Sequence, residues 1–161
     1  WRANRKESPG GAIAALGIHM IDLMCFFGGK VKSVQSLVKK YVVNVNIDDT
    51  TSAIFEFNNK CTGNLTTIFA CPYISTFNIY GTHMNIFSQI DSNTITIFNK
   101  NGKIKNLSLC KNDTLFLELQ EFADSCKCKK NYRVKNEEAI HNIEIMEAIV
   151  KSSKRKKLVY L

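Results

Sequence analysis

The sequence predicts an α+β domain: a two-layer sandwich in which helices cover one side of a largely antiparallel, open-faced β-sheet. The order of its parts supports this prediction, because an apolar helix opens the chain, a long strand-rich stretch follows, and two amphipathic helices close it. The 161 residues, 45% of them hydrophobic, suit a single domain with one core.

The opening helix is expected from the turn at 8–11 to about Phe27, where a pair of glycines ends it. His19 lies four residues after Ala15 and three before Asp22, so a regular helix places these side chains on one face. The rest of this helix is almost wholly apolar. The imidazole and the carboxylate must therefore be paired or line a cavity, because burying either alone is costly. The pattern by itself also fits a core histidine with Asp22 as its partner.

Short runs rich in Ile, Phe, Val and Thr, separated by turn residues, extend from Val31 to Leu109 and predict strands. The tripeptide 58–60 (Asn-Asn-Lys) is typical of a hairpin turn, and polar and apolar residues alternate between 52 and 57. Between Thr51 and Phe98 both alternating sets carry large apolar residues. A single helical layer cannot cover both faces, so we expect the open faces to pack together in a homodimer or homotetramer.

Two helices close the domain before a short strand at 158–161. Asp113 is a good N-cap for the first, in which Leu115, Leu119, Phe122 and Cys126 recur at helical spacing. Asn136 is the expected N-cap of the second. Its residues at helical spacing, predicted to face inward, are Ile140, Ile143, Met146 and Val150.

Composition narrows the classes of partner. No apolar stretch approaches the ~20 residues that cross a bilayer, and no secretory signal opens the chain, so we expect a cytoplasmic protein without membrane contact. The net charge of +8 comes from lysines that gather after the closing helices rather than among aromatics, which favours a solvated edge over a nucleic-acid groove. The six cysteines form no C-x-x-C pair, so we expect reduced thiols and no metal site. His83 and His141 are expected on a turn and a helix surface, without a role.

The opening helix resembles that of the C-terminal domain of Gfo/Idh/MocA oxidoreductases, whose pattern is roughly G-G-x-x-x-D-x-G-x-H-x-x-D. The matching positions are Gly10, Gly11, Gly17, His19 and Asp22. Ala15 stands where the family usually has its first aspartate. The segments 48–57, 79–84, 119–123, 136–140 and 154–161 resemble later parts of the family pattern in order and spacing.

The resemblance implies the substrate-binding and oligomerisation half of an NAD(P)-dependent oxidoreductase. In that family, hydride passes between the nicotinamide and a carbon bearing a hydroxyl, commonly on a sugar or cyclitol. NAD or NADP is held mainly by an N-terminal domain with a G-x-G-x-x-G motif and an active-site lysine, and neither motif occurs here. We therefore expect no cofactor-binding residue in this chain and no hydride transfer by it alone.

The resemblance makes His19 the candidate for contact with the substrate hydroxyl, with Ala15 beside the substrate. Asp22, Gly10, Gly11 and Gly17 are expected to support the site. Arg2 and Arg5, just before the glycine turn, are candidates to grip a carboxylate or phosphate of a small-molecule substrate through bidentate hydrogen bonds. Two alternatives stay open: a non-catalytic binding or assembly module of the same fold, and a basic nucleic-acid-binding α+β module.

Overall fold

The computed structural model describes residues 4–90, 93–127 and 130–161. Within it the chain divides into two compact units, one made of Trp1–Cys71 and Val134–Leu161 and the other of Pro72–Arg133. Each unit has its own four-stranded antiparallel sheet. The predicted α+β class with open antiparallel strands is confirmed, and the strands form two sheets. That 1–161 is a single domain stays a prediction.

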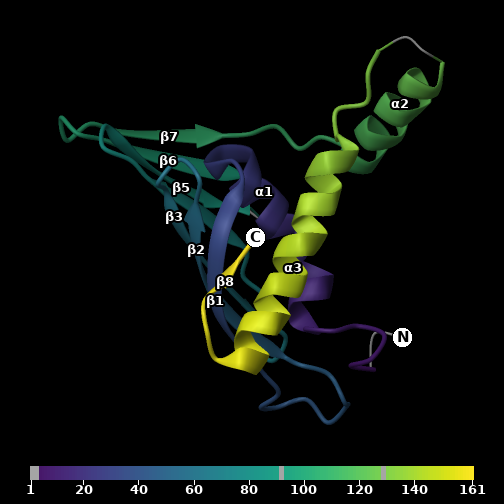
Figure 1. Ribbon diagram of the computed structural model, residues 1–161. Helices are drawn as coiled ribbons and strands as arrows, with labels where there is room; N and C mark the ends of the chain where they lie inside the picture. The colour runs from purple at the N-terminus through teal and green to yellow at the C-terminus, as the bar shows by residue number, and fades with distance from the viewer. Residues whose placement is uncertain (1–3, 91–92, 128–129) are drawn as a thin grey trace. The chain divides into compact units, whose positions relative to one another are not determined.

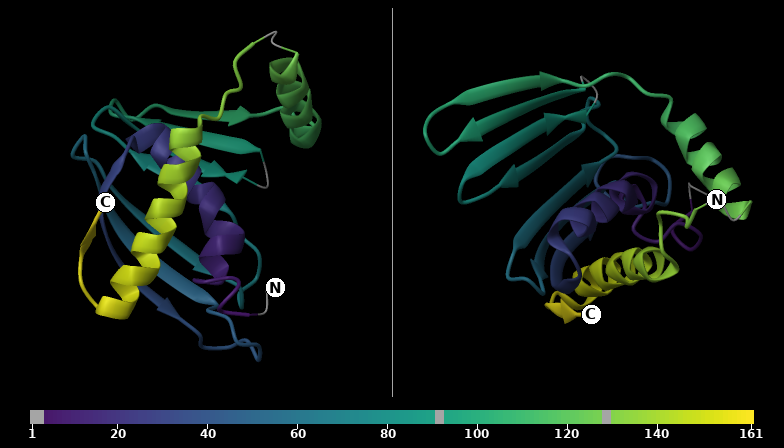
Figure 2. Two further views of the ribbon diagram at one scale, coloured as in Figure 1. Left: turned by 45° about the vertical axis from the view of Figure 1, so that its right-hand side comes forward. Right: turned by 90° about the horizontal axis from the view of Figure 1, so that it is seen from above.

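The sheet of the first unit has the strand order β3-β2-β1-β8. Its strands are β1 (Val31–Lys39), β2 (Thr50–Phe57), β3 (Thr62–Ile68) and β8 (Val159–Tyr160). The helices of this unit are η1 (Ile13–Gly17), α1 (Ile18–Gly28) and α3 (Asn136–Arg155). Figures 1 and 2 show α1 and α3 side by side across the same face of this sheet.

The core of the first unit lies between this helix pair and the inner face of the sheet. Ala53, Phe55 and Phe57 of β2 point inward and are buried, whereas Ser52 and Ile54 are exposed, so the predicted alternation is confirmed. The predicted hairpin turn at 58–60 also forms, and the Lys60 N–H donates to the Phe57 carbonyl at 3.0 Å. The largest fully buried side chains from the helices are Ile13, Ile21, Ile145 and Ile149.

The second unit contains β4 (Thr76–Tyr80), β5 (Met84–Gln89), β6 (Thr94–Asn99), β7 (Ile104–Ser108) and α2 (Thr114–Cys126). Its strands pair in chain order, β4-β5-β6-β7. Asp113 caps α2 as predicted, because its Oδ1 accepts the Phe116 N–H at 2.9 Å. The residues at helical spacing do not form a buried side, since α2 buries none of its residues and Leu115, Leu119 and Phe122 are each more than half exposed.

The predicted inward face of α3 is only partly correct: Met146 is half-buried and packs against the core, but Ile140 and Ile143 are exposed. Ile140 and Ile143 are 59% and 48% exposed, and the buried positions are Asn142, Ile145, Ala148, Ile149 and Ser152. Small residues face the sheet because they let the helix approach β1: Ser152 Oγ accepts the Ser36 N–H at 3.0 Å, and Ser36 Oγ donates to the Ile149 carbonyl at 2.6 Å. The N-cap is Lys135, whose N–H donates to Glu138 Oε2, and Asn136 is the first helical residue.

Candidate functional site

The glycine turn that opens the helix is fixed by backbone contacts. The Gly11 N–H donates to the Ser8 carbonyl and the Ala12 N–H donates to the Asp48 carbonyl, both at 3.0 Å. Gly11 has φ +49°, and a Cβ there would lie 2.0 Å from the Asp48 carbonyl oxygen. No L side chain fits at this distance, so the chain requires glycine where the turn crosses the start of β2.

A single π-helical turn, η1, lies between this turn and His19. The Ile18 N–H donates to the Ile13 carbonyl, five residues back. Gly17 at the end of η1 is buried, and a Cβ there would lie 2.6 Å from Ile13 Cγ1 and 3.3 Å from Thr67 Cγ2 of β3. The missing side chain lets the helix lie close against the sheet. Single π turns within helices are rare and occur often at functional sites.

The structure places His19 and Asp22 on the solvent-exposed side of α1, while Ala15 in η1 is half-buried. Asp22 Oδ1 accepts a hydrogen bond from Asn142 Nδ2 of α3 at 2.7 Å. Within the described ranges, the His19 imidazole forms no hydrogen bond or ion pair. Of the two expected arrangements, paired or lining a cavity, the pairing of His19 with Asp22 does not form among the described residues: the imidazole is exposed and α3 holds the carboxylate. Exposure also removes the burial cost from which that pairing was argued.

Arg5 forms an ion pair within the chain: its Nη2 lies 2.6 Å from Asp48 Oδ1, and its side chain is 47% exposed. This ion pair ties the N-terminal segment to the residue whose carbonyl supports the glycine turn. Arg2, the other candidate, lies outside the described residues.

Asp49 organises the loop between β1 and β2, a role that the sequence did not reveal. This fully buried carboxylate accepts the backbone N–H groups of Tyr41, Val42 and Val43 and the hydroxyl of Thr50. The hydrogen bonds from Val42 and Val43 are the main cause that holds the pKa of the Asp49 carboxyl well below its usual range. The Asp-Asp pair at 48–49 was noted only as part of a family pattern, and its spacing carried no sign of these contacts.

His141 was expected on an open helix surface, but the structure places its side chain largely out of solvent. Its side chain is 13% exposed, its Nε2 accepts the Val31 N–H at 3.1 Å, and its Nδ1 lies 3.3 Å from Glu144 Oε2. With its neighbour Asn142 it joins the first half of α3 to β1 and α1.

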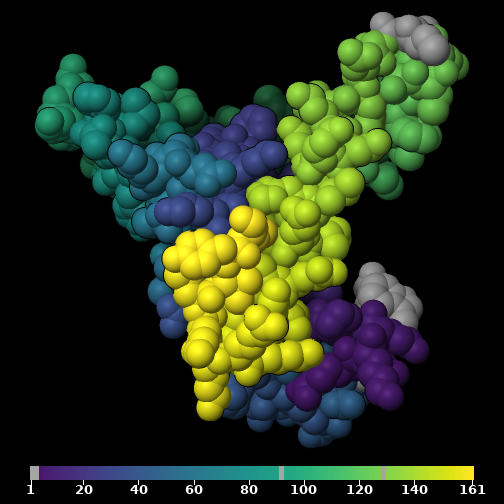
Figure 3. Space-filling model, in the orientation of Figure 1, coloured from purple at the N-terminus to yellow at the C-terminus, as the bar shows by residue number. Residues whose placement is uncertain are grey.

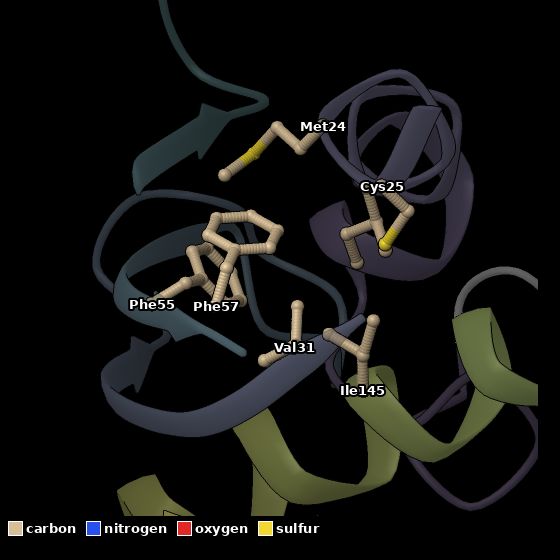
Figure 4. A pocket seen from close by; sticks show the side chains of 7 residues that line it. Met24, Cys25, Val31, Phe55, Phe57 and Ile145 are labelled. Carbon is tan, nitrogen blue, oxygen red and sulfur yellow. The ribbon is translucent and has the colours of Figure 1, made fainter. Parts of the chain in front are cut away.

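A small internal void lies under α1, lined by Ile21, Met24, Cys25, Val31, Phe55, Phe57 and Ile145 (Figure 4). It has no space for a water molecule, so it holds no ligand. Burial, and to a lesser extent the charge of Asp22, raises the pKa of the Cys25 thiol to about 11. Such a thiol is a poor nucleophile, because the thiolate is the reactive form.

In the part of the chain that the structure describes, no group of three or more His, Cys, Asp and Glu side chains could hold a metal ion. No helix formed by the described residues is long and apolar enough to cross a membrane.

Comparison with protein families matches residues 1–87 to the GFO/IDH/MocA C-terminal domain. The matched residues include the glycine turn, η1, α1 and the strands β1 to β4. The chain belongs to the Gfo/Idh/MocA C-terminal domain family.

Solved oxidoreductase structures share this fold. A Desulfitobacterium hafniense protein assigned as an NADPH-dependent oxidoreductase has 26% identity and a TM-score of 0.90, over 99% of this chain and 50% of its own. An Agrobacterium radiobacter oxidoreductase, solved with NAD+, L-tartaric acid and magnesium, has 18% identity and a TM-score of 0.78, over 92% of this chain and 48% of its own. UDP-N-acetylglucosamine 3-dehydrogenase from Acidithiobacillus ferrooxidans has 16% identity and a TM-score of 0.82, over 94% of this chain and 50% of its own.

The chain spans about half the length of these solved structures. No curated protein matches its sequence.

Proposed function

We propose that this chain is the substrate-binding half of an NAD(P)-dependent oxidoreductase that acts on a hydroxyl or keto carbon of a sugar or cyclitol derivative. Family membership and the names of the similar structures support the oxidoreductase class. The observation that carries the proposal is His19, an exposed imidazole on α1 with the small Ala15 one turn before it and with no hydrogen bond within the described ranges.

His19 has the chemistry that such a reaction requires. When hydride leaves the substrate carbon, a base must take the hydroxyl proton, and it must lie within about 3 Å of the oxygen. Imidazole accepts and releases protons near neutral pH. Asp22 cannot turn freely because Asn142 holds its Oδ1, so we assign it the support of the helix face rather than proton transfer.

Ala15 distinguishes this site from the family pattern. Its methyl group has no proton to transfer and leaves room beside His19 that a carboxylate would fill. We propose that proton transfer here depends on His19 together with a group outside this chain, such as the family's lysine. Arg5 stays a candidate for the substrate's charged group, because half of its side chain is accessible while Asp48 orients it.

The residues of this chain do not fit the role of holding the dinucleotide. It has no G-x-G-x-x-G turn between a strand and a helix, and no such cradle occurs within the described ranges. We propose that NAD or NADP, which supplies the hydride acceptor or donor, is held mainly by another domain. The isolated chain is then inactive in hydride transfer and binds neither cofactor tightly.

Kinetics of the full-length protein test this proposal. With NAD+ or NADP+ and a panel of sugars, cyclitols and nucleotide sugars, turnover of one of them is expected. His19→Ala should then lower kcat by roughly 10²–10⁴-fold. His83→Ala is the matched control, because His83 is also exposed but lies on the β4–β5 turn of the second unit. A loss below threefold in a folded His19→Ala protein refutes the role of His19. Micromolar binding of NADH or NADPH by the isolated chain refutes the proposal that another domain holds the cofactor.

We also propose a homodimer or homotetramer that forms through an open sheet face. In the second unit Ile79, Ile86 and Ile97 form one cross-strand row, and all three are half-exposed. None of the described residues of this unit is buried. A sheet with an apolar face and no core of its own gains stability from a partner surface.

A further inference from the structure

Helix α3 carries two apolar stripes. Ile145, Ala148 and Ile149 form the buried stripe that packs against the sheet. The second stripe consists of Ile143, Met146 and Val150, which are spaced by three and four residues. Ile143 is exposed, Val150 is half-buried, and Met146 is half-buried and also packs against the core. A helix with apolar residues on two sides has a second surface to cover.

The second stripe lines a groove of about 490 Å³ that Pro9 borders on the other side. A Cβ on Gly10 would lie 3.2 Å from Val150 Cγ2, so the glycine turn lies directly against α3. Figure 3 shows this N-terminal segment (purple) beside the C-terminal half of α3 (yellow). The turn is held by the hydrogen bonds around Gly11, so this wall is preformed. The volume lies within the roughly 300–1,000 Å³ typical of small-ligand sites.

The end of the groove is strongly basic. Lys151, Lys154 and Arg155 lie at positions i, i+3 and i+4 of α3, so they share one side of the helix, and all three are exposed. Within the described ranges none of their side chains forms an ion pair or a hydrogen bond. Glu147 is the one acidic residue among those that line the groove. Cations at a helix C-terminus complement its dipole, and here they also border an apolar floor.

We propose that this groove binds a nucleoside diphosphate, with the base over Ile143, Met146 and Val150 and the diphosphate against Lys151, Lys154 and Arg155. An apolar floor of this length accommodates the face of a heterocyclic base. Guanidinium binds phosphate oxygens in a bidentate manner, and ammonium groups add charge. The proposal goes beyond the oxidoreductase function, because no residue of the groove belongs to the His19 site.

Titration of the isotope-labelled chain with ADP and with UDP, followed by NMR, tests the proposal without reference to hydride transfer. The methyl signals of Ile143, Met146 and Val150 are expected to shift in a saturable manner. Replacing Lys151, Lys154 and Arg155 together by glutamine should weaken binding at least tenfold. Ile143→Ser, at a position 48% exposed and therefore tolerant of a polar residue, should weaken ADP binding several-fold and leave pyrophosphate binding unchanged.

The matched control replaces Lys100, Lys103 and Lys105 by glutamine. It removes the same charge from exposed positions of the second unit and should leave the affinity unchanged. The proposal is overturned if these methyl signals do not move or if the control variant loses as much affinity as the groove variant. Pyrophosphate binding as tight as ADP binding also overturns it, because the floor then contributes nothing.

Discussion

Replacing Ile145 by alanine tests which face of α3 forms the core. Ile145 is fully buried and lines the void under α1 (Figure 4), whereas Ile143 on the same helix is 48% exposed. The two substitutions change helix propensity equally, so their difference in unfolding free energy reports packing alone.

The expected loss of unfolding free energy follows from how deeply each side chain is buried. Ile145→Ala removes three buried carbon atoms, worth about 2.4 kcal/mol at ~0.8 kcal/mol each. The neighbours of a truncated core side chain relax only partially, so a cavity contribution brings the expected loss to about 3–4 kcal/mol. Ile143→Ala loses about half of the transfer energy, and alanine's higher helix propensity returns part of it, which leaves about 0.8 kcal/mol.

Thermal unfolding followed by far-UV circular dichroism measures both variants. For a chain of this size, about 1 kcal/mol corresponds to roughly 2–4 °C. Ile145→Ala should therefore lower Tm by about 6–16 °C and Ile143→Ala by about 2–3 °C. Equal losses, or a larger loss at Ile143, would show that α3 packs through the face that simple periodicity predicts and would refute this arrangement of the core.

Three further expectations follow from the structure. Because the pKa of Asp49 is lowered in the folded state, the stability it contributes is present above the unfolded value near ~3.9 and is lost as pH falls through the lower folded pKa. As the pH falls, the Tm of the wild type should therefore decrease more steeply than the Tm of the Asp49→Asn variant. An equal decrease of the two Tm values with pH would contradict this. At pH 8, iodoacetamide should modify Cys25 much more slowly than the exposed Cys61, as mass spectrometry would show, because burial raises the pKa of Cys25 to about 11. Light scattering should find the full-length protein dimeric or tetrameric at tens of micromolar, and Ile86→Lys should shift it toward the monomer. A strict wild-type monomer rules out the proposed interface.

Local patterns with a single physical solution could be predicted from the sequence. Alternation along β2 placed Phe55 and Phe57 inside, because a strand with one buried face needs a period of two. Asp113 could be recognised as a cap, because its side chain satisfies a free N–H of the first helical turn. The need for glycine at the turn was likewise visible, although its cause, the Asp48 carbonyl, comes from a segment 37 positions away from Gly11.

The packing of α3 could not be predicted, because its sequence contains two stripes at helical spacing. The more apolar stripe, through Ile143 and Val150, was preferred as the core. The structure buries the stripe with Ala148 and Ser152, since small side chains permit close approach to β1 and the serine hydroxyl satisfies the Ser36 N–H. Contact with the sheet therefore selects this stripe, whose Ile145 and Ile149 also supply apolar core contacts, and the stripe through Ile143 and Val150 stays partly exposed.

The orientation of His19 depends on a feature that periodicity cannot show. A regular helix was assumed through Ala15, His19 and Asp22, but the π turn adds a residue to the turn just before His19 and rotates everything after it. Gly17 permits this turn because it packs against Thr67, a residue fifty positions away. Asn142 then holds Asp22 from α3. The family motif thus names the residues of the proposed site, and contacts with β3 and α3 decide where they face. A substitution at Gly17 or Asn142 should therefore raise KM and lower kcat of the proposed reaction by shifting the His19 face of α1, although the imidazole itself is retained.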